Sequence, residues 1–144
     1  MDARFEDFVG MVYSLNKEIQ RIKSEKMAEF GLRGTDTMVI YYLAENPDGE
    51  TRADLARLTR LDRAAITRIV GKLKADGLVT EASGDNSVNY RRRVRLTEGG
   101  RRAAREMEEV IQSVVDEASA DVGEGERARM YGTLEKILDA LERV

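Results

Sequence analysis

The sequence predicts a mainly α-helical chain with a small β-hairpin, and three observations support this fold class. Apolar residues recur at helical intervals over most of the 144 residues. Two short segments in the middle have the pattern of β-strands, and Gly, Asp, Asn and Ser lie between them. The chain is 42% apolar and 35% charged with one proline, a composition typical of a helix-rich globular protein.

The first helix is predicted over residues 5–27 and should end near Phe30 and Gly31. Its apolar residues follow helical spacing: Phe5, Phe8, Val9, Val12, Ile19 and Ile22. Thr35 is the predicted N-cap of a second helix, because its hydroxyl can accept a hydrogen bond from a backbone N–H of the first turn. The sequence Asn-Pro-Asp-Gly at residues 46–49 is typical of a turn and should end this helix.

Two further helices are predicted directly after this turn. Thr51 and Asp54 form a weak capping box at the start of a short helix of about two turns. Asp62 is a good N-cap for a longer helix that runs to Asp76, and Gly77 follows where a left-handed C-terminal cap is expected. A short helix, a turn and a longer helix form the helix-turn-helix arrangement, which places its second helix in the major groove of DNA.

The longer helix has two contrasting faces. Its apolar stripe consists of Ile66, Ile69, Val70 and Leu73 and should face the core. The opposite face carries Ala64, Arg68, Gly71 and Ala75, flanked by Thr67 and Lys72. A mid-helix glycine costs about 1 kcal/mol relative to alanine, and close approach to a large partner would explain Gly71. We expect Thr67 and Arg68 to contact base edges and Lys72 to contact phosphate; the alternative is an incidental solvated face.

A β-hairpin, or wing, is predicted after Gly77. Its strands should span residues 78–82 and 89–96, with a turn at residues 83–87. Alternation in the second strand puts Tyr90, Arg92, Val94 and Leu96 on one side and Arg91, Arg93 and Arg95 on the other. Arginines on a thin hairpin are suited to a minor groove or to flanking phosphates.

The chain ends are predicted to form a helical dimerisation region. Thr97 should cap a helix, and a break at residues 123–125 should precede the last one. The first and last helices each present an apolar stripe that nothing else in the chain can fully cover, so dimerisation is the economical solution. We therefore divide the chain into a winged helix-turn-helix lobe at residues 35–97 and a dimerisation region at residues 1–31 and 98–144.

Charge is segregated along the chain although the net charge is only −3. Residues 1–50 and 106–144 carry −4 and −7, whereas residues 51–105 carry +8, with fourteen Lys and Arg against six Asp and Glu. A basic centre attracts a polyanion such as nucleic acid, while the acidic flanks repel it. This charge pattern therefore favours binding in one orientation. The alternative is that these charge runs only keep helices in solution.

The composition excludes several classes of function. There is no cysteine and no histidine, which leaves no disulfide, no thiol switch and no cysteine-based zinc site. The 27 acidic residues are dispersed, so we expect neither an enzyme nor a cofactor. No apolar run is long enough to span a membrane and the N-terminus is acidic, so the expected location is the cytoplasm.

Four segments together resemble the multiple-antibiotic-resistance regulator (MarR) family of winged helix-turn-helix proteins. These are residues 51–56 at the start of the short helix, 66–73 in the recognition helix, 77–79 at the wing entry and 94–100 at its exit. The resemblance implies a homodimer that binds pseudo-palindromic DNA and usually represses transcription until a small ligand or an oxidant releases it. It gives Thr67, Arg68 and Lys72 the base and phosphate contacts.

The sequence departs from the family pattern at two places. Residues 88–90, Val-Asn-Tyr, stand where the family usually has an Asp-x-Arg turn, so any of Arg91, Arg92 or Arg93 can be the minor-groove residue. Ala65 replaces a common hydroxyl residue and removes one expected contact. The predicted DNA-binding residues are Arg63, Ala64, Thr67, Arg68, Lys72, Arg91, Arg92 and Arg93.

The missing cysteine excludes the thiol switches of the family. A small ligand is then the remaining releasing signal, and a phenolic or aromatic effector is compatible with the resemblance. Its cleft would lie near Tyr13, Met38, Tyr41 and Tyr42; the alternative is that these residues belong to the core and the dimer interface. Other interpretations are another winged-helix regulator family, a winged-helix module that binds an acidic protein, and a carboxylate-based hydrolase. Steep salt dependence with sequence preference would distinguish a DNA reader from a protein-binding module.

Overall fold

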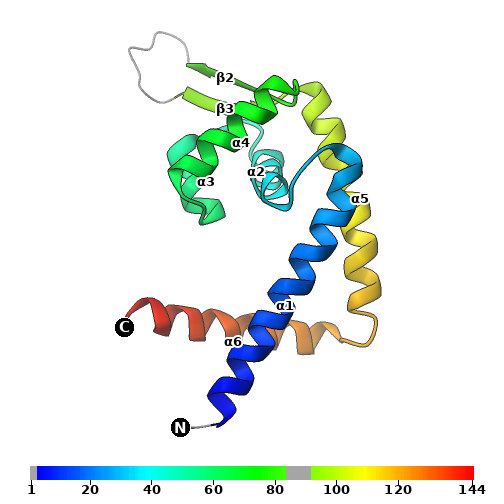
Figure 1. Ribbon diagram of the computed structural model, residues 1–144, viewed down its shortest axis with the longest axis vertical. Helices are drawn as coiled ribbons and strands as arrows, with labels where there is room; N and C mark the ends of the chain where they lie inside the picture. Colours follow the sequence, from blue (N-terminus) through cyan, green and yellow to red (C-terminus); the bar gives the residue numbers. More distant parts are fainter. Residues whose placement is uncertain (1–2, 84–91) are drawn as a thin grey trace. The chain divides into compact units, whose positions relative to one another are not determined.

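The computed structural model describes residues 3–83 and 92–144 (Figure 1). The described elements are α1 (Ala3–Met27), a 3₁₀ turn η1 (Ala28–Phe30), α2 (Gly34–Glu45), β1 (Glu50–Thr51), α3 (Arg52–Thr59), α4 (Arg63–Ala75), β2 (Val79–Ser83), β3 (Arg92–Leu96), α5 (Glu98–Ala118) and α6 (Glu124–Glu142). The chain divides into two compact units, Met1–Met107 and Glu108–Val144. The predicted class, mainly α with a small β-hairpin, is confirmed.

The sheet has three antiparallel strands in the order β1-β3-β2. The predicted hairpin pairs Val79 with Leu96 and Glu81 with Val94. Strand β1 was not predicted, because two residues are too few to show a period of two. It pairs Glu50 with Val94 and therefore covers the second edge of β3.

The start of α2 differs from the prediction, and Thr35 is not its N-cap. The helix begins two residues earlier than predicted, at Gly34 with Arg33 as N-cap, so Thr35 lies inside the first turn. The cap is closed by Asp36, whose Oδ2 accepts a hydrogen bond from the Arg33 backbone N–H at 2.8 Å. A side chain added at Gly34 would place its Cβ 3.2 Å from the Cβ of Lys23, so α2 begins in close contact with the end of α1.

The caps predicted for the helix-turn-helix are confirmed. Thr51 Oγ1 accepts a hydrogen bond from the Asp54 backbone N–H at 3.1 Å, and Asp62 Oδ1 accepts one from the Ala65 N–H at 2.8 Å. Gly77 follows α4 with a φ of +74°, the left-handed conformation that glycine adopts without a Cβ clash. Local hydrogen bonds thus define both ends of the helix that was expected to contact DNA.

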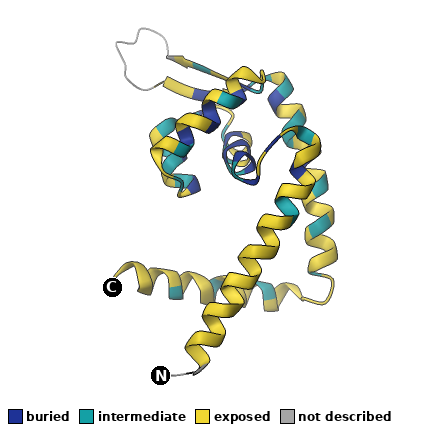
Figure 2. Ribbon diagram, in the orientation of Figure 1, coloured by how far each residue is buried: buried dark blue, intermediate teal, exposed yellow. Residues whose placement is uncertain are grey.

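The core of the first unit lies between α2, α3, α4 and the sheet (Figure 2). Its fully enclosed apolar residues include Val39, Ile40, Leu43, Leu55, Ile66, Ile69, Val70, Leu73 and Val94. All four members of the predicted apolar stripe of α4 are in this set. Their burial determines which side of α4 faces outward.

The exit of the wing is bonded to its entry. Thr97 donates its backbone N–H to the Leu78 carbonyl at 2.9 Å and its hydroxyl to the Gly77 carbonyl at 2.7 Å. The same hydroxyl accepts from the Gly100 N–H at 3.0 Å, so Thr97 caps α5 as predicted. A Cβ at Gly100 would overlap the Leu78 carbonyl oxygen, which makes a side chain at this position incompatible with the packing.

Large apolar residues remain exposed outside this core. On α1 they are Phe5, Phe8, Val9, Met11, Val12, Tyr13, Leu15 and Ile19. On α6 they are Met130, Tyr131, Leu134, Leu138 and Leu141. None of the helices in residues 3–83 and 92–144 is long and apolar enough to cross a membrane.

Two glycine substitutions should have opposite effects on stability. Gly100→Ala should lower the free energy of unfolding by about 1–3 kcal/mol or more, because the new methyl group overlaps a fixed carbonyl. Gly71→Ala should raise it by about 0.5–1 kcal/mol, since the added Cβ meets no atom within 4 Å and alanine is the better helix former. Denaturant unfolding of both variants measures the difference, and equal effects would contradict this packing.

Candidate nucleic-acid interface

The outward face of α4 is open and free of internal bonds. Arg63, Ala64, Thr67 and Arg68 are all exposed. The side chains of Arg63, Thr67 and Arg68 have no hydrogen bond or ion pair to another described residue. Gly71 lies on the same face with empty space around it, so packing within the described chain does not require a glycine there. The polar side chains of this face are therefore available to form hydrogen bonds or ion pairs with a large partner.

Lys72 has different surroundings from the other predicted contact residues of α4. Its Nζ donates to Asp36 Oδ2 at 2.8 Å and to the Gly31 carbonyl at 2.7 Å. Asp36 is completely buried, whereas the Lys72 side chain is about one-third exposed. The ammonium is thus held on the side of α4 that faces α2. Its predicted phosphate contact stays a prediction, and it would compete with this ion pair.

The wing arginines fall into three groups. Arg91 lies outside the described residues. The side chain of Arg92 is exposed and has no hydrogen bond or ion pair to another described residue. Arg93 Nη1 donates to the Gly49 carbonyl at 3.0 Å and Arg95 Nε donates to the Asp48 carbonyl at 2.8 Å, so both guanidinium groups are held by the turn before β1.

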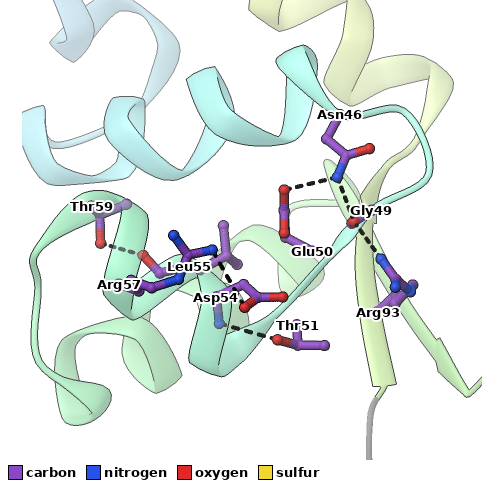
Figure 3. A network of polar contacts seen from close by, with 9 residues as sticks. All are labelled: Asn46, Gly49, Glu50, Thr51, Asp54, Leu55, Arg57, Thr59 and Arg93. Carbon is purple, nitrogen blue, oxygen red and sulfur yellow. Dashed lines mark hydrogen bonds and ion pairs between the residues drawn. The ribbon is translucent and has the colours of Figure 1, made fainter.

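The turn at residues 46–49 joins the wing to the helix-turn-helix (Figure 3). The Gly49 carbonyl accepts hydrogen bonds from Arg93 and, at 3.1 Å, from Asn46 Nδ2, which also donates to Glu50 Oε1 at 2.8 Å. Gly49 has a φ of +93°, and an added Cβ would lie 2.7 Å from Arg95 Cγ. Thr51 then pairs with Arg93 in the sheet and caps α3, so this one residue belongs to both the sheet and the helix-turn-helix.

A second link joins the wing to the helices through Glu81 of β2. Arg52 Nε and Nη2 donate to its two carboxylate oxygens at 2.7 and 2.9 Å, and Lys74 Nζ lies 3.5 Å from Oε1. The Glu81 side chain is only 5% exposed. Hydrogen bonds from Arg52 are the main cause that lowers the pKa of Glu81, and attraction by Arg52 and Lys74 adds to them against the opposing effect of burial. No local sequence pattern predicts this link, because the two partners are 29 residues apart.

The four predicted effector residues lie on two helices. Met38 and Tyr42 are half-buried on α2, and Tyr41 is exposed beside Tyr42 with ring centroids 5.0 Å apart in an edge-to-face arrangement. Tyr13 is 69% exposed on α1 and precedes Lys23, the α1 residue next to Gly34, by ten positions, or about 15 Å of helix. The effector site near these residues stays a prediction. Among the described residues, no group of three His, Cys, Asp or Glu side chains could hold a metal ion.

The Glu81 link should make stability depend on pH. The folded-state pKa lies below the ordinary value of about 4.3, so its contribution is complete above that pH and is lost as pH falls through the folded pKa. Glu81→Gln should lower the free energy of unfolding at pH 7 by about 1–3 kcal/mol, and the difference from wild type should shrink below about pH 4. Urea unfolding across pH measures this.

The matched control is Glu25→Gln. Glu25 forms an ion pair with Arg21 in which both side chains are more than half exposed, so its loss should be nearly silent at any pH. A Glu81→Gln effect that stays constant down to pH 2 would contradict the assignment.

Comparison with known proteins agrees with this architecture. A family model described as the MarR family matches residues 30–86, from the end of η1 into the wing. No curated protein matches the chain by sequence.

Several solved structures share the fold over nearly the whole chain at low identity. A MarR-family transcriptional regulator from Rhodococcus sp. RHA1 has a TM-score of 0.81 at 19% identity, covering 95% of this chain and 96% of that one. A MepR–DNA complex from S. aureus has a TM-score of 0.81 at 16% identity, covering 92% and 97%. CouR from Rhodococcus jostii RHA1, bound to p-coumaroyl-CoA, has a TM-score of 0.84 at 19% identity, covering 95% of each chain.

The matched segment contains α2, α3, α4 and β2, which carry the caps, the core stripe and the open face described above. The sequence match and the shared fold lead to one conclusion. The chain has the winged-helix fold, and its residues 30–86 are similar to the MarR family.

Proposed function

We propose that this chain is a DNA-binding transcription regulator that inserts α4 into a major groove. The observation that carries the proposal is the open face of α4, on which Arg63, Thr67 and Arg68 are exposed and unpaired within the described chain. This face belongs to the segment of the sequence that carries +8, which attracts the phosphate backbone. The MepR–DNA complex, which has the same fold, supports this use of the architecture.

Each residue of the face has a role that follows from its chemistry. Arg68 can donate two hydrogen bonds to the O6 and N7 of a guanine, and Thr67 can contact either a base edge or a thymine methyl group. Arg63 at the helix start is suited to phosphate. Ala64 and Gly71 leave room for the groove to approach the backbone closely. The exposed Arg92, with Arg91 or Arg93, would contact the minor groove or flanking phosphates beside the wing.

We further propose that the regulator acts as a homodimer and as a repressor on a pseudo-palindromic operator. The exposed apolar residues of α1 and of α6 support dimerisation, because a second copy is the simplest way to remove both surfaces from water. A symmetric dimer presents two copies of α4, which matches an inverted repeat.

An aromatic or phenolic effector is proposed as the releasing signal. The p-coumaroyl-CoA bound by CouR is a phenolic ligand on the same fold. Tyr41, Tyr42 and Met38 would supply the aromatic and apolar contacts for such a ring.

Selection of bound duplexes from a random DNA library tests the function as a whole. We expect an inverted repeat with half-sites about one helical turn apart, and a steep fall in affinity as salt rises. Binding without any enriched sequence, lost evenly with salt, would overturn the proposal and favour a winged-helix module that binds an acidic protein.

Substitution of Arg68 tests the base-contact role. Arg68→Ala should weaken operator binding by about 1–3 kcal/mol and flatten the preference at one base pair of each half-site. Competition between operator duplexes that differ at single positions measures both effects.

Two further variants serve as controls for Arg68→Ala. Arg129→Ala removes an exposed arginine from the acidic second unit and should leave operator affinity unchanged. Arg92→Ala should weaken all duplexes evenly and reduce the salt slope by about one. If Arg68→Ala binds operator as tightly as wild type does, the assignment of the recognition face to this side of α4 is wrong.

A further inference from the structure

The contacts of Lys72 differ from those expected of a phosphate-binding lysine. Such a lysine normally extends its ammonium freely into solvent, as a flexible point charge. Here Nζ has two short hydrogen bonds inside the first unit, to Asp36 Oδ2 and to the Gly31 carbonyl. Moving the ammonium to a phosphate would break both of them.

Asp36 makes that movement costly. Its carboxylate is completely buried, and Oδ2 accepts only from Lys72 and from the Arg33 N–H among the described residues, while Oδ1 has no partner there. A buried carboxylate that loses its one cationic partner is strongly unfavourable. The ion pair should therefore stay closed when α4 meets DNA.

The partners of Lys72 define what the ion pair connects. Gly31 ends the segment of α1 and η1 with a φ of +67°, and Asp36 lies in the first turn of α2. Lys72 is one residue away from both Gly71 on the open face and Leu73 in the core. The ion pair thus joins the corner between α1 and α2 to the last turn of the recognition helix.

We propose that Lys72 is a positioning residue that fixes α4 against the corner of α1 and α2, and that it is not a phosphate ligand. The proposal rests on the proposed DNA-binding function. It makes the orientation of Thr67 and Arg68 depend on where α1 ends. A change in α1 would be transmitted to the recognition face through this ion pair.

Two variants separate positioning from phosphate binding. Lys72→Met keeps the length of the side chain and removes the charge. Asp36→Asn keeps an acceptor for the Arg33 N–H and releases the ammonium. If Lys72 positions α4, each variant should lower operator affinity about 2- to 30-fold, the double variant should lose no more than either single one, and Lys72→Met should leave the salt slope unchanged.

Two controls accompany them. Lys74→Met removes the other lysine of α4, which contacts Glu81 instead of Asp36, and should lower operator affinity less than Lys72→Met does. Val39→Ala removes a buried side chain of α2 without touching the ion pair. It should destabilise the protein and yet keep operator affinity when binding is measured well below its unfolding temperature.

The opposite results would overturn the proposal. If Asp36→Asn binds operator as tightly as wild type or tighter, and Lys72→Met lowers the salt slope by about one, then Lys72 is a phosphate ligand. If Val39→Ala loses as much operator affinity as Lys72→Met, the ion pair contributes only general stability.

Hydrogen exchange of the free protein gives a measurement that needs no DNA. Lys72→Met should speed exchange of the α4 backbone amides more than Val39→Ala does at equal global stability. Equal exchange in the two variants would overturn the positioning role even where DNA binding is intact. Absence of any sequence-specific binding by wild type would instead refute the proposed function, and the exchange result would still decide whether Lys72 holds α4.

Discussion

The burial of one face of α4 is the constraint on which the rest of the winged-helix lobe depends. Ile66, Ile69, Val70 and Leu73 are enclosed by α2, α3 and the sheet, so α4 cannot rotate about its axis without exposing them to water. The same burial turns Thr67 and Arg68 outward. It also directs the chain after Gly77 into β2, because the left-handed cap follows the last buried turn. The burial of this apolar stripe therefore determines which face of α4 is open and where the wing begins.

Polar links then fix the wing on this core, and each uses a charged or hydroxyl side chain that could otherwise face solvent. Arg52 holds Glu81 of β2, Arg93 of β3 holds the turn before β1, and Thr97 bonds the exit of the wing to its entry. The basic residues that the structure describes in the central segment thus fall into two sets. One set is bonded within the lobe, and the other, which includes Arg63, Arg68 and Arg92, has no bond to a described residue and is open to a polyanion.

The apolar residues of α1 and α6 differ from those of the winged-helix lobe in their exposure to water. Within the lobe the apolar side chains are satisfied by one another, whereas α1 and α6 retain large exposed side chains such as Met11 and Leu141. Such surfaces are unfavourable in water, and the proposed homodimer would remove them from it. In the proposed function, dimerisation and DNA binding are carried by different residues.

The sequence by itself determined the features that depend on neighbours a few residues apart. The N-caps Thr51, Asp62 and Thr97, the left-handed Gly77 and the apolar stripe of α4 were all predicted, because helical periodicity and capping hydrogen bonds are local. Thr35 was predicted wrongly, since Asp36 one residue later closes the same helix end. The open face of α4 followed from its periodicity as well.

Only the tertiary structure decided which charged side chains are bonded within the lobe. Arg52 and Glu81 are 29 residues apart, and Lys72 and Asp36 are 36 residues apart, so no local pattern pairs them. Strand β1 likewise exists only because β3 lies beside it. The physical reason is that the energy of a buried ion pair or of a strand pairing depends on through-space distance and burial, which the linear order of residues does not contain.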